Sequence, residues 1–358
     1  MIEFIRMSKY LILKVGALGD LSFFLPVIDQ LKKKDPQAQV TWIVGRTYAE
    51  FLEKHPAIDH LIAVDEKRLF FGSPLQRLQA VLQLWCKVGW SYQAILVGHR
   101  TLGAFLLLRF RVFGRFFQIV RRPSRLLSLF RTEIVIPPLQ IQESLAFKQM
   151  TEHVLQQSIA DQDWVWNSDW VSTLSLFSSL KKEHLPLVCV HIGGGSNAKT
   201  EFQLKKWPYW KEFLELVLKS TSAQVVLVGA PSERSEAEEL MSSWNSWQGR
   251  IENRVGKTQV SELISLLKSA SCFVGVDSGP LHFADSMGVV CVGIYGPTSP
   301  VSWGLLGSRS QVFHHQVPCS PCYRDDGVFP ECAHEHVCMK RLKPEELMQK
   351  VQNLLKNE

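Results

Sequence analysis

Long hydrophobic runs are missing from this sequence of 358 residues. A membrane-spanning helix needs about 18 uninterrupted apolar residues, whereas the run over 11–18 is broken by Lys14 and the run over 104–108 ends at Arg109. No apolar N-terminal segment is followed by a cleavage site, so we expect no signal peptide. Met7 is an alternative translation start directly before the first predicted strand. A cytoplasmic location is therefore expected.

Cysteine is far too infrequent for a disulfide-rich scaffold, and half of the cysteines lie in apolar surroundings. The chain has eight cysteines and is 46% hydrophobic and 21% charged, which excludes a small disulfide-stapled or disordered protein. The length predicts two domains, because single hydrophobic cores seldom grow beyond roughly 250–300 residues. Four cysteines are expected to behave as small core residues in a reducing compartment, namely Cys86, Cys189, Cys272 and Cys291.

Acidic residues are few in the first part of the chain. Residues 1–140 contain 20 Lys+Arg against 10 Asp+Glu, a net charge of +10, and the remainder contains 20 against 24, a net charge of −4. A basic half predicts an anionic partner or surface. No DNA- or RNA-binding motif accompanies these charges, so we do not expect a nucleic-acid partner.

Short apolar runs alternate with amphipathic stretches in both halves. This alternation predicts an α/β fold with two doubly wound, Rossmann-like domains whose parallel sheets face a central cleft. We expect strands at 10–15, 40–44, 61–64, 94–97, 187–192, 224–228, 272–276 and 290–294. We expect helices at 21–34, 47–54, 74–88, 208–219, 233–244, 259–269 and 344–355.

The domain boundaries follow from a segment rich in serine and tryptophan between the halves. We expect an N-terminal domain over 1–165, a linker over 166–186 and a C-terminal domain over 187–342. The last segment, 343–358, starts with a proline and carries one apolar face. We expect its helix to pack back toward the N-terminal domain.

A glycine-rich turn, Gly16–Asp20 (GALGD), joins the first predicted strand to the first predicted helix. Its glycines allow another molecule to approach closely. Asp20 is either an N-cap of the helix or a carboxylate that acts as a general base. The turn is neither a dinucleotide-binding fingerprint nor a P-loop.

The segment Val276–His282 (VDSGPLH) ends a strand and opens a helix in the second half. Ser278 or Asp277 can cap this helix, and the free N–H groups of its first turn can bind an anion. His282, one turn further, is either a structural histidine or a donor to a phosphate. A glycine-rich loop at 191–197 leads to Lys205, which is either a solvated lysine or a point charge for a phosphate.

In their order along the chain, these motifs make the sequence resemble the ADP-heptose:lipopolysaccharide heptosyltransferase family, glycosyltransferase family 9. Members are inverting glycosyltransferases with the GT-B fold. The resemblance spans nearly the whole chain. It rests on GxxGD at 16–20, the glycine loop followed by KKWP at 193–208, GAPSE at 229–233, VDSGPLH at 276–282 and YGPT at 295–298.

The resemblance implies a role for each matching residue. Asp20 would take the proton from an acceptor hydroxyl, and Gly19, Lys67 and Arg68 would contact the acidic acceptor. Lys205 would bind the donor phosphates, with Lys206 or Lys199 as alternatives because the preceding loop is longer than in familiar members. The implied donor-binding residues are Gly194, Gly195, Ser196, Lys205, Glu233, Thr258, Asp277, Ser278, Gly279, Leu281 and His282.

The resemblance implies transfer of heptose from ADP-heptose to the lipopolysaccharide inner core, at the cytoplasmic face of the inner membrane of a Gram-negative-type bacterium. No metal or other cofactor is expected in this reaction, because helix N–H groups and lysine would stabilise the leaving diphosphate. Alternatives are a related transferase that uses another nucleotide sugar or acceptor, and a non-catalytic relative that binds anionic glycolipids.

Two further segments carry competing interpretations. Residues 100–131 hold eight arginines and no acid; they form either a core helix and a strand with a solvated face, or a basic surface for the phosphorylated acceptor and the anionic membrane. The spacing Cys319-x2-Cys322-x9-Cys332-x5-Cys338 offers ligands for a structural zinc. Reduced packing cysteines or a redox-sensitive loop are the alternatives.

Overall fold

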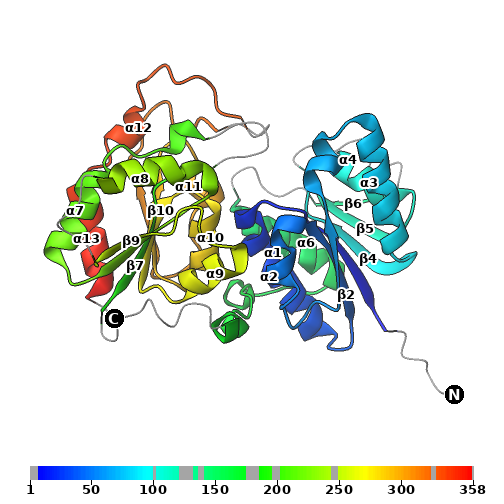
Figure 1. The fold of residues 1–358 in the computed structure, drawn as a ribbon. Coiled ribbons are helices and arrows are strands. Elements are labelled where there is room, and N and C mark those ends of the chain that lie inside the picture. The colour runs from blue at the N-terminus through cyan, green and yellow to red at the C-terminus, as the bar shows by residue number, and fades with distance from the viewer. Residues whose placement is uncertain are drawn as a thin grey trace. The chain divides into compact units, whose positions relative to one another are not determined.

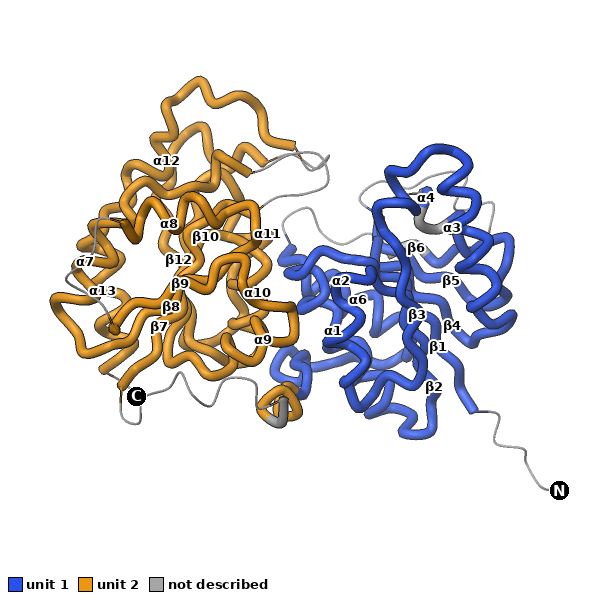
Figure 2. Tube along the Cα trace, in the orientation of Figure 1, with its two compact units in different colours: residues 1–167 blue, residues 168–358 orange. Residues whose placement is uncertain are grey.

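The computed structural model describes residues 7–99, 102–120, 132–135, 141–174, 185–195, 202–242, 249–323 and 328–356. The chain divides into two compact units, residues 1–167 and 168–358 (Figure 2). The division falls inside the predicted linker, of which residues 175–184 lie outside the described part. Within the described residues, no helix has the length and apolarity that a bilayer crossing requires.

The first unit contains six parallel strands in the order β3-β2-β1-β4-β5-β6 (Figure 1). Apolar runs in its strands are buried on both faces because helices cover both sides of the sheet. The elements are β1 (Lys9–Leu13), α1 (Leu18–Lys34), β2 (Gln39–Gly45), α2 (Arg46–Leu52), β3 (His60–Val64), a π-helical turn η1 (Lys67–Phe71), α3 (Pro74–Lys87), β4 (Ser91–Val97), α4 (Leu102–Arg109), β5 (Phe113–Ile119), β6 (Glu133–Val135) and α6 (Glu143–Leu155).

The two faces of the first sheet have separate layers. On one face, Leu84 of α3 and Leu108 of α4 are buried in a core with Leu11 and Leu13 of β1. On the other face, Phe24 of α1 packs between Trp42 of β2 and Phe147 of α6, with ring centres 5.8 and 4.9 Å apart. Helices α3 and α4 therefore form the outer layer on one side of this unit.

The second unit contains six parallel strands in the order β12-β11-β10-β7-β8-β9. Its principal elements are β7 (Leu187–His191), α7 (Trp210–Ser220), β8 (Gln224–Val228), a short turn η5 (Pro231–Glu233), α8 (Arg234–Ser242), β9 (Ile251–Asn253), α9 (Val260–Lys268), β10 (Cys272–Val276), α10 (Gly279–Ser286), β11 (Cys291–Tyr295), α11 (Pro300–Trp303), β12 (Gln311–His314), α12 (Val337–Lys340) and α13 (Pro344–Leu355).

Each sheet reverses its strand order beside a central strand. β1 lies between β2 and β4, and β7 lies between β10 and β8. Ligands of doubly wound sheets bind at the carboxyl ends of the strands at such a reversal. The loops after β1, β7 and β10 therefore occupy the positions where this architecture forms sites.

These two doubly wound parallel sheets confirm the predicted fold class. The expectation for the last helix is wrong: α13 packs on α7, β10 and β11 of the second unit instead of returning to the N-terminal domain. Its apolar face, with Leu347, Val351 and Leu354, is buried in the core of that unit. The amphipathic helix was predicted correctly, but its apolar face packs on the sheet of its own unit.

In the arginine-rich segment, residues 102–109 form α4 and residues 113–119 form β5. Leu108 of α4 is buried, and along β5 the residues 113–115 are exposed while 116–119 are buried. Arg115 forms two hydrogen bonds to the Glu133 carboxylate, at 2.8 and 3.0 Å. Arg100 and residues 121–131 lie outside the described residues.

Candidate functional site

Asp20 lies in the first turn of α1, directly after the carboxyl end of β1. Lys14 Nζ donates hydrogen bonds to Asp20 Oδ2 at 2.6 Å and to the Gly98 carbonyl at 3.1 Å. The Lys14 side chain is 4% exposed and that of Asp20 is 36% exposed. Ala17 holds the N-cap position, so Asp20 is not the N-cap. The ion pair fixes the carboxylate and leaves part of it accessible.

Two polar side chains beside this ion pair stay uncharged near neutral pH. Burial, assisted by the Lys14 charge, lowers the pKa of His99 to about 3, and its Nε2 accepts a hydrogen bond from Val15 N at 2.9 Å. Burial and the carboxylates of Glu66 and Asp20 raise the pKa of Tyr48 to about 12. Neither His99 nor Tyr48 therefore carries a charge beside the Asp20 carboxylate near neutral pH.

The predicted acceptor residues divide into one buried and two exposed positions. Gly19 is buried within α1, where its carbonyl accepts a hydrogen bond from Ser22 Oγ at 2.7 Å. Lys67 and Arg68 are exposed in η1, which follows β3 and so lies at the same sheet edge as Asp20. Arg68 Nε lies 3.5 Å from Asp65 Oδ2, an exposed pair of small energetic weight.

In the second unit, His191 at the end of β7 connects the loops after β8 and β10. Its Nδ1 lies 3.0 Å from Ser278 Oγ and its Nε2 lies 3.1 Å from Glu233 Oε2. Glu233 also accepts hydrogen bonds from the backbone N–H groups of Gly195 and Ala230, at 3.1 and 2.7 Å. Burial opposes ionisation of Glu233, but His191 and these N–H groups lower its pKa to about 2.

A second buried cluster joins Lys205, Asp277 and His282. Lys205 Nζ donates to the Asp277 carbonyl at 2.9 Å and to its Oδ2 at 3.0 Å, and His282 Nε2 lies 2.8 Å from Asp277 Oδ1. Burial would raise the pKa of Asp277, but Lys205 and His282 hold it below the usual range. Two of the three ammonium N–H groups of Lys205 are engaged in these bonds, which leaves one for a ligand.

The glycine loop after β7 allows close contact between these groups. A Cβ on Gly193 would lie 1.8 Å from Glu233 Oε1, and one on Gly194 would lie 2.2 Å from the Phe202 carbonyl. Gly195 has φ +75°, a left-handed conformation that favours glycine. The loop thus brings the Gly195 N–H against the Glu233 carboxylate where side chains would not fit.

The remaining predicted donor residues have mixed placements. Ser278 is the N-cap residue of α10, with its hydroxyl directed to His191 and not to the helix, and Gly279 begins the helix. Leu281 is fully buried against β11, so its side chain belongs to the core. Thr258 is half-buried before α9. Ser196 and Lys199 lie outside the described residues.

The two adjacent lysines 205 and 206 have different surroundings. Lys205 is buried in the Asp277 cluster, whereas Lys206 Nζ pairs with Glu236 Oε2 of α8 at 2.6 Å. Of these two, Lys205 is the one that lies beside the N-terminus of α10.

Sequence reasoning missed Lys14, His99, Tyr48 and the central position of His191. One signal was present: Lys14 interrupts an apolar run that forms a buried strand, and a buried lysine requires a partner. His191 stands at the strand end before the glycine loop, where its two ring nitrogens can bridge neighbouring loops. His99 and Tyr48 have no comparable signal, because they reach the site from β4 and α2.

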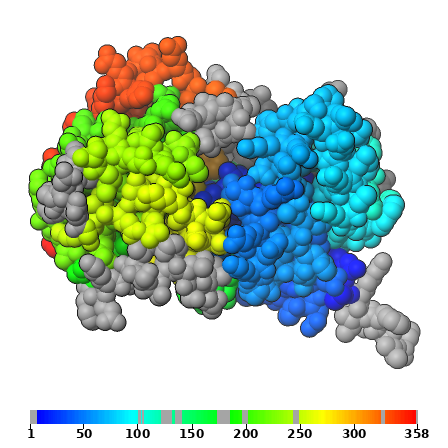
Figure 3. Space-filling view, in the orientation of Figure 1, coloured from blue at the N-terminus to red at the C-terminus, as the bar shows by residue number. Residues whose placement is uncertain are grey.

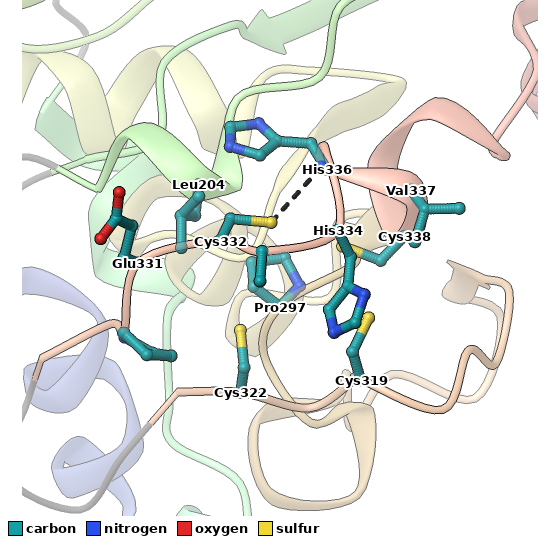
Figure 4. A pocket seen from close by; sticks show the side chains of 12 residues that line it. Leu204, Pro297, Cys319, Cys322, Glu331, Cys332, His334, His336, Val337 and Cys338 are labelled. Carbon is teal, nitrogen blue, oxygen red and sulfur yellow. Dashed lines mark hydrogen bonds between the residues drawn. The ribbon is translucent and has the colours of Figure 1, made fainter.

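The four C-terminal cysteines line a pocket of about 200 Å3, together with His334 and His336 (Figure 4). Burial and the neighbouring thiols raise the pKa of Cys338 to about 11, so this thiol stays protonated at neutral pH. In the described residues, which include all four cysteines, no three His, Cys, Asp or Glu side chains are placed to hold a metal ion. The described side chains are therefore not arranged as the zinc site that was one of the three alternatives.

An Asp-x-Asp motif at residues 161–163 is also not arranged as a metal site. Asp161 pairs with Lys148, and Asp163 Oδ1 lies 3.6 Å from Lys33 Nζ. Each of the two carboxylates therefore faces a lysine, one on α6 and one on α1, and the two are not arranged around a shared metal position.

Comparison with known proteins gives a consistent family. Residues 195–332 match the family described as Glycosyltransferase family 9 (heptosyltransferase). Lipopolysaccharide heptosyltransferase 1 of Pseudomonas aeruginosa is 24% identical over 97% of this chain and 98% of its own length. Lipooligosaccharide heptosyltransferase 2 of Campylobacter jejuni is 29% identical, but only over 38% of this chain and 43% of its own length.

A solved structure shares the fold over the whole chain. The E. coli heptosyltransferase WaaC with ADP is 18% identical, covers 97% of this chain and 99% of its own, and superimposes with a TM-score of 0.73. The same enzyme is also known with ADP-2-deoxy-2-fluoro heptose, at a TM-score of 0.70. At this identity the likeness supports the two-sheet fold.

Proposed function

We propose that this chain, which belongs to glycosyltransferase family 9 and has the GT-B fold, transfers heptose from ADP-heptose to the lipopolysaccharide inner core. The printed names of its full-length relative and of the WaaC complexes supply the substrate class. The observation that carries the proposal is the Lys205–Asp277–His282 cluster at the N-terminus of α10. It lies at the strand reversal of the second sheet, where this architecture binds nucleotides.

Asp20 acts as the general base in the proposed reaction. Its ionised carboxylate, held by Lys14, accepts the proton of the attacking acceptor hydroxyl. Lys67 and Arg68, at the same sheet edge, attract the acidic acceptor. The nearby His99 and Tyr48 remain neutral and do not compete for that proton.

The second unit stabilises the leaving diphosphate. The first N–H groups of α10 and the free N–H of Lys205 offer hydrogen bonds to phosphate oxygens. Glu233, ionised and fixed by His191, accepts hydrogen bonds from the ribose hydroxyls of the donor. Attack of the acceptor oxygen forms the new glycosidic bond as the bond to the diphosphate breaks, which inverts the anomeric carbon.

A donor and acceptor assay with the Asp20→Ala variant tests the reaction. We expect a kcat about 10²–10⁴-fold lower, the usual contribution of a general base, with ADP binding unchanged because the donor cluster lies in the other unit. Full activity of this variant would refute the role of Asp20. Wild-type protein without transfer or donor hydrolysis would favour the non-catalytic, glycolipid-binding alternative, and preference for a UDP- or GDP-sugar would favour a related transferase.

The proposed reaction proceeds without a divalent metal. Lysine and helix N–H groups neutralise the diphosphate in this account, so we expect most of the activity to persist in EDTA. Complete loss in EDTA, restored by magnesium, would contradict it.

A further inference from the structure

We propose that the outer side of α3 and α4 is a docking surface for an anionic phospholipid bilayer. This α3–α4 face consists of six exposed apolar side chains on α3, in the turns that follow α3 and α4, and at the start of β5: Leu75, Leu78, Leu82, Trp90, Phe110 and Phe113. Binding of a bilayer does not depend on catalysis. Only the link between this surface and a lipid-anchored acceptor rests on the proposed function.

The apolar residues of α3 are placed as on an interfacial helix. Leu75, Leu78 and Leu82 follow i, i+3, i+7 spacing and are 48–65% exposed, while Leu84 on a different side of the helix is buried in the core. The helix thus has a second apolar stripe besides the one that packs on the sheet. Figure 3 shows the segment that contains α3 and α4, in light blue to cyan, at the surface of the first unit.

Aromatic residues gather where α3 and α4 end. Trp90, Phe110 and Phe113 are each 66–68% exposed, and Phe113 N donates to the Trp90 carbonyl at 2.7 Å. Trp85 Nε1 of α3 donates to the Leu107 carbonyl of α4 at 2.6 Å, which joins the two helix ends. Tryptophan and phenylalanine at such a rim suit the boundary between headgroups and acyl chains.

The charge around the face complements an anionic bilayer. The described residues between 67 and 120 contain seven Lys+Arg and no Asp or Glu. The guanidinium of Arg111 lies 3.6 Å from the centre of the Trp90 ring, which places a cation directly beside an exposed aromatic. Docking of a protein partner on an apolar surface does not require an excess of positive charge, whereas an anionic lipid surface attracts such an excess.

The orientation of α3 connects this face to the proposed chemistry. Its N-terminus follows η1, so Leu75 lies near the sheet edge that carries Asp20, Lys67 and Arg68. A 14-residue helix is about 21 Å long. A bilayer that lies along this helix would hold a lipid-anchored acceptor near the sheet edge that carries Asp20, the proposed base for the acceptor hydroxyl.

Vesicle flotation of the full-length protein tests the surface. We expect binding to phosphatidylcholine vesicles that contain phosphatidylglycerol, weaker binding in high salt and little binding to pure phosphatidylcholine. The variant Leu75→Gln/Leu78→Gln/Leu82→Gln should partition about tenfold or more less strongly. Lys87→Gln should lower binding to the anionic vesicles about fivefold and leave the neutral ones unaffected.

A matched control carries the same chemical change elsewhere. Val301→Gln/Leu306→Gln replaces exposed apolar residues of the second unit and should bind vesicles as the wild type does. Equal binding by the triple α3 variant, or no binding by the wild type, would overturn the proposal. If the wild type is a dimer and the α3 variant is a monomer, the face is instead a contact between two copies of this chain. The α3 variant should still transfer sugar to a short, soluble acceptor, because this reaction needs no bilayer. If the wild type fails in that assay, the proposed function is contradicted but the docking surface is not.

Discussion

At the scale of single residues, Lys14 determines the surroundings of Asp20. It is a buried cation whose hydrogen bonds to Asp20 and Gly98 connect the end of β1 with α1 and with the end of β4. A Cβ on Gly98 would lie 2.8 Å from Lys14 Cδ, so the lysine stem is closely enclosed. Lys14 therefore positions the Asp20 carboxylate and places a positive charge beside it, and we predict no contact between Lys14 and the substrate.

We expect Lys14→Met, which keeps much of the side-chain volume, to lower kcat about tenfold or more while the KM for the donor stays the same. The Lys14 charge helps to lower the pKa of His99, so the pKa of His99 should rise in this variant. Steady-state kinetics and an NMR titration of His99 measure the two effects. Lys54→Met, at an exposed lysine, is the control; an unchanged kcat in Lys14→Met would contradict the positioning role.

Glu233 makes the stability of the second unit depend on pH. Its pKa is about 2 in the folded protein against an ordinary 4.5, so its stabilising contribution is complete above pH 4.5 and is lost as the pH falls toward 2. The shift corresponds to about 3 kcal/mol. In urea unfolding, the gap between wild type and Glu233→Gln should be widest at neutral pH and shrink below pH 4.5.

The matched control is Glu236→Gln, which removes a half-exposed surface pair with Lys206. Its effect should stay below about 1 kcal/mol at every pH. A gap for Glu233→Gln that stayed constant from neutral to acidic pH would show that the carboxylate contributes nothing through its charge.

At the scale of elements, the glycine loop after β7 is the most constrained connection. We expect Gly193→Ala to displace Glu233, because the new Cβ would lie 1.8 Å from Glu233 Oε1. ADP affinity should fall about tenfold or more and stability by about 1–3 kcal/mol. Isothermal titration and urea unfolding measure these changes.

The control for this loop is Gly103→Ala in α4, where none of the described residues outside the local helix backbone places an atom within 4 Å of the added Cβ. There alanine should stabilise by about 0.5–1 kcal/mol, because glycine is unfavourable inside a helix. Equal, small effects of the two substitutions would refute the close approach of Glu233 to the loop.

Elements that carry their own periodicity could be predicted from the sequence. The apolar runs at 187–191, 224–228 and 272–276 became β7, β8 and β10 because parallel strands are buried on both faces. The three-residue strands β6 and β9 were missed, since such short segments have no readable period. Asp20 and Lys205 follow recognisable turns, whereas the bridge from His191 to Glu233 depends on three strands meeting at one edge.

The partner of α13 shows the same limit. Its amphipathic face was readable from the sequence, but nothing local indicates which sheet face remains uncovered. The structure buries Leu347 and Val351 against the second sheet. The spacing of apolar residues thus predicts that one face of the helix is buried, but only the tertiary structure shows which element it packs against.

At the scale of the whole molecule, charge and function are divided between the units. Residues 1–167 hold 21 Lys+Arg against 14 Asp+Glu and residues 168–358 hold 19 against 20, net charges of +7 and −1. Net charge thus marks the unit proposed to meet an anionic acceptor and bilayer. The nearly neutral unit is proposed to bind a diphosphate with local groups, namely one lysine and one helix N-terminus.

This division predicts that donor binding is a property of the second unit alone. Each unit has its own buried core, and a chain of this size buries enough surface to fold by itself. Residues 168–358, expressed separately, should bind ADP within about fivefold of the whole chain, a difference of roughly 1 kcal/mol. Residues 1–167 should not bind it. A folded 168–358 fragment without ADP affinity, judged by calorimetry beside circular dichroism, would show that the donor site needs residues of the first unit.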